Sequence, residues 1–395
     1  MKRLIGCTAA LCLLAMLALM VGCGGVTNTG TLAYISNSTG TGFTVYNINT
    51  DGTLTRASIS PQDTPGAPKI MQFSPNGKWA YFLDAGGANM YAYTRAGNGT
   101  LQTKIDAYPV GPNASSLVIN SSSTYLYVAE PNTNMLGTYS IDPSTGMLYH
   151  VGSDATIGYA ITQLILSPSG TVMYGLSPTQ QTIVSWTLNT STGLAEETSV
   201  TSVGVYPNFM ILSASGSYMY VTDSRSTYTI PGSGGLTTPN IFGFSTSSSG
   251  VLQTMGVFNE QASQLTGIYP SIPVGGATSH DNRYLFVVNQ GSHNISVFQI
   301  ATTSGNLLEV AGSVTTVNGV STSTASPFDC GAGCSTPSYG IVAPSNNAIY
   351  VIDPNASSGS GLIFQYAIDQ NTGRLRQMSP ASVSGEGAPT WITVK

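Results

Sequence analysis

The stretch "ILSASGSYMYVTD", residues 211–223, is one copy of a phrase that returns along the chain. "ILSPSGTVMYGLS" occupies residues 165–177, and "VINSSSTYLYVAE" occupies residues 118–130. Successive copies are therefore offset by 46 and 47 residues. A fixed period of this length indicates a repeat architecture, in which each copy is one supersecondary unit.

Three columns of residues run through the repeat, and each has seven members. An aromatic residue near the end of the phrase gives the first column: Tyr34, Tyr81, Tyr127, Tyr174, Tyr220, Phe286 and Tyr350. A second aromatic column follows at Tyr46, Tyr93, Tyr139, Trp186, Phe244, Phe298 and Tyr366. A glycine turn comes next, at Gly52, Gly99, Gly146, Gly193, Gly250, Gly305 and Gly373.

Each unit predicts four short antiparallel strands, one before the "SPSG"-like turn, one on each aromatic column and one after the glycine. Seven such units predict an all-β fold, a seven-bladed β-propeller over residues 32–395. The first unit lacks its inner strand. We expect the C-terminal residues Trp391–Lys395 to supply it and so to remove the free edge of an open ring.

The repeat lengthens at four places: Ser224–Asn240, Asn259–Pro273, Ser313–Pro337 and Pro354–Gly361. All four fall between the second and third strands or between blades, and successive turns of an antiparallel blade alternate between its two ends. We therefore expect the insertions on one face, as a raised lip beside the central depression, where binding would occur. The alternative is that these Gly/Ser/Thr-rich segments are tolerated spacers.

The N-terminus has the pattern of a targeting segment. Lys2 and Arg3 precede an apolar run over 4–21, and "MVGC" resembles a bacterial lipobox ending at Cys23. We expect a signal peptide over 1–22, lipid attachment at Cys23, a short linker over 23–31 and a place in the cell envelope. Plain secretion and an uncleaved membrane anchor are the alternatives.

Composition narrows the partners and the cofactors. Charged residues make up 7% of the chain and the net charge is −5, so nucleic acid is not an expected partner. Cys330 and Cys334, in "DCGAGC", are expected to form a local disulfide rather than a metal site, because two thiols alone are too few ligands. We expect no metal, no cofactor and a monomer.

Few side chains are suited to catalysis. Among the three histidines, His293 is the candidate, since His150 and His280 are expected to be structural or at the surface. Arg225, Asp223 and Glu130 are weaker catalytic candidates. Together with Asp84 and Asp353 these residues define the expected ligand-binding face. The polar residues that end the second strands also have a plainer interpretation, in which they cap strand ends and turns.

Several phrases, among them "FSPNGKWAYFLD" and "YLFVVNQGSHNISVFQI", resemble the lactonase-type propellers, which include the 6-phosphogluconolactonase-like enzymes and the YVTN-repeat proteins. The resemblance covers residues 31–395 and implies the same fold. The enzymes' "PRH"-like element corresponds to Pro273-Val274-Gly275 here, and their Asn-Glu pair corresponds to Asn289-Gln290. A glutamine cannot act as a general base.

Two main functions remain after these observations, with a purely structural envelope or adhesive repeat protein as a residual third. The first is a lipid-anchored propeller that binds a small molecule, a glycan or an envelope protein without catalysis. The alternative is a lactonase-like hydrolase or isomerase that acts on a sugar-derived lactone or acid.

Overall fold

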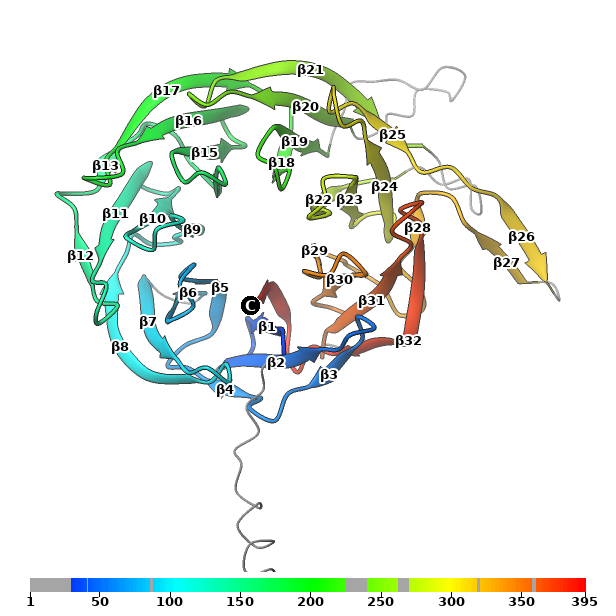
Figure 1. The fold of residues 1–395 in the computed structure, drawn as a ribbon, viewed down its shortest axis with the longest axis horizontal. Coiled ribbons are helices and arrows are strands. Elements are labelled where there is room, and N and C mark those ends of the chain that lie inside the picture. The colour runs from blue at the N-terminus through cyan, green and yellow to red at the C-terminus, as the bar shows by residue number, and fades with distance from the viewer. Residues whose placement is uncertain are drawn as a thin grey trace, which may run out of the picture.

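The computed structural model describes residues 30–40, 42–85, 88–224, 240–261, 270–317, 320–356 and 360–395. Its strands form seven four-stranded antiparallel blades arranged in a ring (Figure 1). The described residues contain strands and turns but no helix, and so none that could cross a membrane. The predicted all-β, seven-bladed propeller is therefore confirmed. Residues 1–29, which include Cys23, lie outside the described part.

Each blade runs from an inner strand at the axis to an outer strand at the rim. Blade 1 is β33 (Pro389–Val394), β1 (Leu32–Asn37), β2 (Gly42–Ile48) and β3 (Leu54–Arg56). Blade 2 is β5 (Pro68–Phe73), β6 (Trp79–Asp84), β7 (Asn89–Arg95) and β8 (Leu101–Pro109). Blade 3 is β9 (Ser116–Ile119), β10 (Tyr125–Glu130), β11 (Met135–Ile141) and β12 (Leu148–His150). Blade 4 is β14 (Gln163–Leu166), β15 (Val172–Ser177), β16 (Thr182–Leu188) and β17 (Ala195–Ser202).

The remaining blades follow the same order. Blade 5 is β18 (Pro207–Leu212), β19 (Tyr218–Asp223), β20 (Asn240–Thr246) and β21 (Leu252–Asn259). Blade 6 is β22 (Pro273–Thr278), β23 (Tyr284–Asn289), β24 (Asn294–Ile300) and β25 (Leu307–Glu309). Blade 7 is β29 (Tyr339–Val342), β30 (Ala348–Asp353), β31 (Leu362–Ile368) and β32 (Leu375–Ser384). Short strands β4 (Gln62–Asp63), β13 (Ala155–Thr156) and β28 (Phe328–Asp329) continue the outer edges of blades 1, 3 and 6.

The ring closes through both ends of the chain, as expected. β33 is the inner strand of blade 1 and pairs antiparallel with β1, with Ala33 opposite Val394 and Ile35 opposite Ile392. Leu32 and Lys395 exchange two backbone hydrogen bonds, with N–O distances of 2.8 and 2.9 Å. The inner strand of the first blade therefore belongs to the far end of the sequence.

The first aromatic column and the glycine column of the repeat meet across neighbouring blades. A buried tyrosine of one second strand donates its hydroxyl to the carbonyl of the turn glycine in the next blade. The pairs are Tyr34–Gly99 (2.6 Å), Tyr81–Gly146 (2.8 Å), Tyr127–Gly193 (2.9 Å), Tyr220–Gly305 (2.6 Å) and Tyr350–Gly52 (2.6 Å). These glycines have φ between 71° and 92°, a region that side chains disfavour.

One insertion lies elsewhere than the spacing predicts. Between Ser313 and Pro337 the chain forms the hairpin of β26 (Val314–Val317) and β27 (Val320–Ser323), which pair only with each other. β25 and β28 both pair with β24, so the hairpin interrupts the outer strand of blade 6. It therefore projects from the rim, away from the axis, and forms no lip beside the central depression (Figure 1). The reason is that an outer strand has no neighbour on its far side.

Candidate functional site

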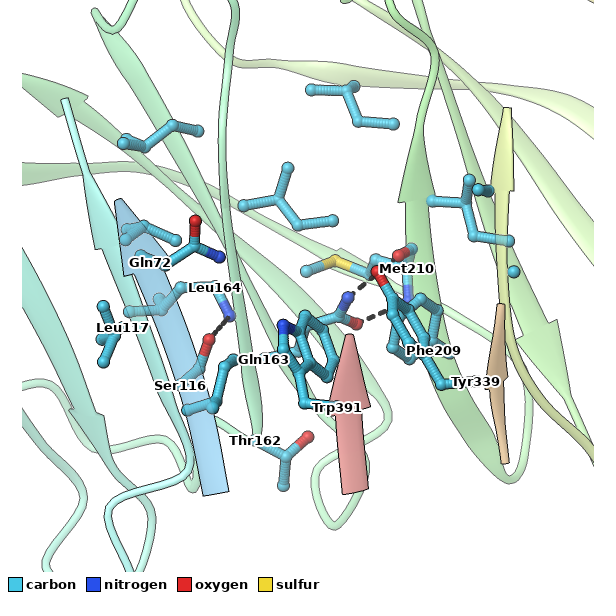
Figure 2. A pocket seen from close by; sticks show the side chains of 18 of the residues that line it. Gln72, Ser116, Leu117, Thr162, Gln163, Leu164, Phe209, Met210, Tyr339 and Trp391 are labelled. Atoms are coloured by element: carbon cyan, nitrogen blue, oxygen red, sulfur yellow. Dashed lines mark hydrogen bonds between the residues drawn. The ribbon is translucent and has the colours of Figure 1, made fainter. Parts of the chain in front are cut away.

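The site best suited to a ligand is a cavity on the axis of the ring. Its volume is about 600 Å³, which is within the usual range for small-molecule pockets. All seven inner strands contribute to its wall, from Ser116 of β9 and Gln163 of β14 to Trp391 of β33. Figure 2 shows these side chains converging between the strands of different blades.

Two aromatic rings form one side of this cavity. The rings of Tyr339 and Trp391 are stacked, with centroids 4.2 Å apart and planes 11° apart, and Phe209 lies 5.7 Å from Tyr339. Tyr339 begins β29, whereas Trp391 belongs to β33, so the stack joins blade 7 to blade 1. A flat aromatic face of this kind accepts the C–H face of a sugar-like ring.

Polar side chains fasten the inner strands to one another, because these strands do not pair across blades. The Gln163 amide donates to the Met210 carbonyl (3.0 Å) and accepts from the Met210 N–H (2.7 Å). Asn208 donates to the Pro273 carbonyl (2.7 Å), and Ser116 accepts from the Leu164 N–H (3.0 Å). These bonds hold the wall of the cavity rigid.

Two polar groups of the wall are left available to a ligand. Neither the Gln72 amide nor the Tyr339 hydroxyl makes a hydrogen bond to the described residues. Burial raises the pKa of Tyr339, so its hydroxyl stays protonated and can donate. A ligand would thus meet an amide on β5 and a hydroxyl beside the aromatic stack.

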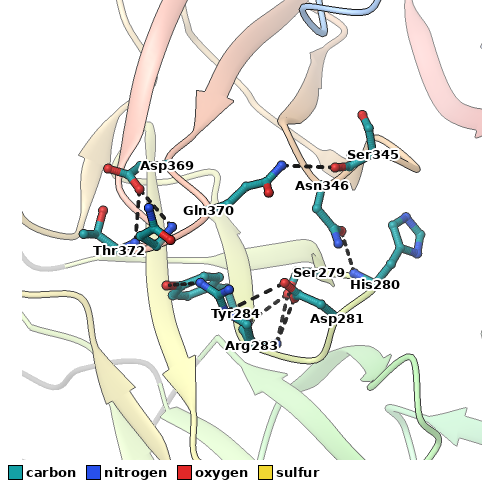
Figure 3. A network of polar contacts seen from close by, with 11 residues as sticks. Ser279, His280, Asp281, Arg283, Tyr284, Ser345, Asn346, Asp369, Gln370 and Thr372 are labelled. Atoms are coloured by element: carbon teal, nitrogen blue, oxygen red, sulfur yellow. Dashed lines mark hydrogen bonds and ion pairs between the residues drawn. The ribbon is translucent and has the colours of Figure 1, made fainter.

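His280 lies at the mouth of the cavity. It belongs to the tight turn between β22 and β23, and its side chain is exposed. Its backbone N–H donates to Asn346 Oδ1 (2.7 Å), and Ser279 and Asp281 accept from the Arg283 N–H (3.1 Å each). The imidazole points away from this network (Figure 3). The turn therefore fixes the backbone and leaves the ring free.

The carboxylates expected on the ligand-binding face instead accept hydrogen bonds from backbone N–H groups. Asp223 is 1% exposed and accepts from the N–H groups of Val205 (2.5 Å) and Tyr206 (3.0 Å). Asp353 is fully buried and accepts four N–H groups, those of Ser335, Thr336, Asn355 and Ala356 (2.6–3.1 Å).

Glu130 and Asp84 occupy the same place in their blades. Glu130 is 2% exposed and accepts from the Gly111 N–H (2.7 Å), and Asp84 packs against Gly66. None of these four carboxylates is part of the cavity wall. Each carboxylate instead holds the connection that leads into the inner strand of its own blade. Because each serves a different blade, the four do not form one site.

The other expected site residues that the structure describes lie away from the cavity. His293 is exposed, with φ +52°, and its carbonyl accepts from the Cys330 N–H (2.9 Å). Arg225 lies outside the described residues. Cys330 and Cys334 form a disulfide, and the Tyr366 hydroxyl donates to the Cys330 carbonyl (2.5 Å). The disulfide closes a local loop, and the Tyr366 hydrogen bond links this loop at the end of the insertion to blade 7.

Sequence reasoning missed the cavity wall, because its residues belong to the repeated inner strands and resemble core positions. One signal was available. The resemblance to the lactonase-type enzymes singled out the segment at Pro273, whose carbonyl accepts from Asn208 of the wall (2.7 Å). In the described part of the chain, no three His, Cys, Asp or Glu side chains gather as metal ligands would.

Known structures share this architecture over nearly the whole chain. A periplasmic gluconolactonase of Pseudomonas aeruginosa matches with a TM-score of 0.71 and 15% identity, over 92% of this chain and 98% of that one. The fold is that of the lactonase-type propellers. A Lactobacillus plantarum protein matches with a TM-score of 0.70 and 15% identity, over 93% of this chain and 99% of that one.

A Bacteroides uniformis protein proposed to be a 6-phosphogluconolactonase matches with a TM-score of 0.69 and 13% identity, over 93% of this chain and 100% of that one. No family model matches the sequence, and no curated protein sequence matches it. The likeness to the lactonases is therefore one of fold.

Proposed function

We propose that the protein binds a sugar-derived lactone in the axial cavity and hydrolyses it to the acid. The observation that carries this proposal is the Tyr339–Trp391 stack, which faces a cavity of about 600 Å³ beside the free Gln72 amide. An aromatic face with a few polar groups suits a ring that has apolar faces and hydroxylated edges. The gluconolactonase among the structures of the same fold supports this choice of substrate.

His280 is the residue proposed to assist hydrolysis. The imidazole at the mouth can take a proton from water as the water attacks the lactone carbonyl. Tyr339 begins β29, at the other end of the inner strands, where its hydroxyl can donate to a hydroxyl group of the same ligand. The ring C–O bond then breaks, and the alkoxide regains a proton from the imidazolium. The products are the open hydroxy acid and the free base.

Hydrolysis is tested with glucono-δ-lactone, by the acid released above the rate without protein. We expect His280→Asn to lower this rate by at least about tenfold, because a general base contributes about 10²–10⁴-fold. His293→Asn is the matched control, an exposed histidine outside the cavity, and should act like the wild type. Equal rates for the two variants would remove His280 from the mechanism.

Binding is tested separately through tryptophan fluorescence. Trp79 and Trp186 are 3% and 2% exposed, so Trp391 is the tryptophan that a ligand in the cavity can reach. Adding glucono-δ-lactone or gluconate should change the emission of the wild type but not of Trp391→Phe. An unchanged spectrum at millimolar ligand would contradict the proposed site.

Binding without hydrolysis is the second candidate function. One observation favours it: the described wall contains a single histidine, His280, and no Asp, Glu, Lys or Arg, so it offers few groups for general acid–base catalysis. A fluorescence change with no hydrolysis above background would select this candidate.

We also propose a lipid-anchored location in the cell envelope. The support is the lipobox-like "MVGC" at Cys23 and the periplasmic origin of a protein with the same fold. Labelled fatty acid should be incorporated by the wild type and not by Cys23→Ser.

A further inference from the structure

At the junction between blades 5 and 6, a buried carboxyl group comes from the connection between blades and not from the end of a second strand. In blades 3, 5 and 7 a carboxylate at the end of the second strand accepts backbone N–H groups from the connection leading into its own blade. In blade 6 the same position is Asn289, which is fully buried. Here the carboxyl group comes from the connection itself, at Glu260, directly after β21.

Glu260 is buried without a partner for its charge. Its side chain is 1% exposed, and neither carboxyl oxygen has a hydrogen bond to the described residues. Ser296 and Asn289 lie beside it, but the Asn289 amide donates to Asn294 Oδ1 (3.0 Å) and to Ser296 Oγ (2.9 Å). An ionised carboxylate in such a place costs far more than the neutral acid.

A second carboxyl group lies close to the first. Glu309, at the end of β25, accepts from the N–H of Gln261 (2.7 Å), the residue after Glu260, and from the Ser326 hydroxyl (2.7 Å). Glu309 thus links the connection after β21 to the outer edge of blade 6. Each carboxyl group disfavours ionisation of its neighbour.

We propose that Glu260 and Glu309 form a proton-dependent clasp, which holds Glu260 and Gln261, the two residues directly after β21, on blade 6 while its carboxyl groups are protonated. The protonated pair fits an environment that offers few donors. When both groups ionise, two negative charges are confined together, and Glu260 and Gln261 separate from the blade. The proposal stands apart from ligand binding in the cavity.

The surrounding charges leave this pair unneutralised. No Lys or Arg of the described chain acts on either carboxyl group. On neighbouring elements, His293 lies just before β24 and Asp329 belongs to β28, and both are exposed. The Arg374 guanidinium of blade 7 donates to the Ala311 carbonyl (3.0 and 3.3 Å), two residues after Glu309. Burial raises the pKa of Glu260 to about 8, helped by the charge of Glu309, and burial raises the pKa of Glu309 to about 7.

The sign of the pH effect follows from these shifts. Both groups have a higher pKa in the folded protein than in the unfolded chain, so the folded state binds more protons over this range. Their contribution to stability is complete below about pH 4.5 and is lost as the pH rises through 7 and 8. The melting temperature should therefore fall as the pH rises from about 5 to about 8.

The test compares melting temperatures from pH 5 to pH 9 for the wild type, Glu260→Gln and Glu130→Gln. Glutamine imitates the protonated acid, so Glu260→Gln should lose most of the decline and melt above the wild type at pH 9. Glu130→Gln is the matched control: it alters a buried glutamate that is held by backbone, and it should keep the full decline. The same slope in all three proteins would contradict the clasp.

Two further measurements keep the test decisive. If Glu260→Gln does not fold, the carboxyl signal of Glu260 in the ¹³C-labelled wild type should titrate well above the ordinary glutamate range, and titration near pH 4.5 would overturn the proposal. If added Ca²⁺ raises the melting temperature of the wild type at pH 9 but not that of Glu260→Gln, the carboxyl group holds a cation instead of a proton, and the clasp is wrong.

Discussion

At the scale of single residues, the repeat is explained by hydrogen bonds between tyrosine and glycine. The Tyr220 hydroxyl donates to Gly305 within the chain, and the Tyr350 hydroxyl donates to Gly52 across the closure of the ring. Both tyrosines are fully buried, so a hydroxyl without an acceptor there would be costly. Phe286 fills the corresponding place in blade 6, which shows that the ring packs there without the hydroxyl.

Removing one hydroxyl should have a modest, measurable effect. Tyr220→Phe and Tyr350→Phe should each lower the free energy of unfolding by about 0.5–1.5 kcal/mol, the usual net value of a hydrogen bond. Chemical denaturation measures this difference. Tyr149→Phe is the control, because Tyr149 is 53% exposed, and it should change nothing. A loss at Tyr149 equal to that at Tyr220 would refute the explanation.

At the scale of elements, the sequence could predict the strands and the closure but not the cavity wall or the hairpin at the rim. Periodicity finds strands because every blade repeats the same aromatic and glycine positions. The site is formed where seven inner strands meet, and a period along one chain does not show which residues meet there. The sequence shows how long each insertion is. It does not show that Ser313–Pro337 interrupts an outer strand, because that depends on the pairing of β28 with β24.

The role of the polar residues at the ends of the second strands was left open by the sequence. Asp223 and Asp353 could have faced solvent or backbone, and both face backbone N–H groups. The plainer of the two interpretations, strand and turn capping, describes what these carboxylates do. Glu260 escaped notice because it belongs to an insertion and repeats nowhere else in the chain.

Two deletions of similar kind should have opposite outcomes. Removing Trp391–Lys395 takes away most of β33, including the Thr393 bond to the Met71 carbonyl (2.8 Å), and should lower the melting temperature strongly. Replacing Val314–Ser323 with two glycines removes a hairpin that pairs only with itself, and should leave the melting temperature nearly unchanged. Calorimetry of the two proteins checks both statements, and an unchanged C-terminal deletion would contradict the closure.

At the scale of the whole molecule, the blades are joined by side chains and by one shared sheet. Inner strands of different blades do not pair, so bonds such as Gln163–Met210 hold one blade to the next. Blade 1 is different, because its sheet contains strands from both ends of the chain. Opening the ring at this blade requires unpairing β33 from β1, whereas any other junction can separate without loss of strand pairing.

Because the first and last strands are adjacent, the chain can be circularly permuted so that it begins at a different blade. Lys395 and Leu32 are already hydrogen bonded, so a short glycine linker can join them, with new ends placed after β13, in the connection at Gly158–Tyr159. This circular permutant would retain every strand pair, yet each blade would then be one continuous segment. Its first and last blades would meet through side chains alone. The difference in unfolding free energy between the two proteins would therefore measure the value of sharing a blade between the chain ends.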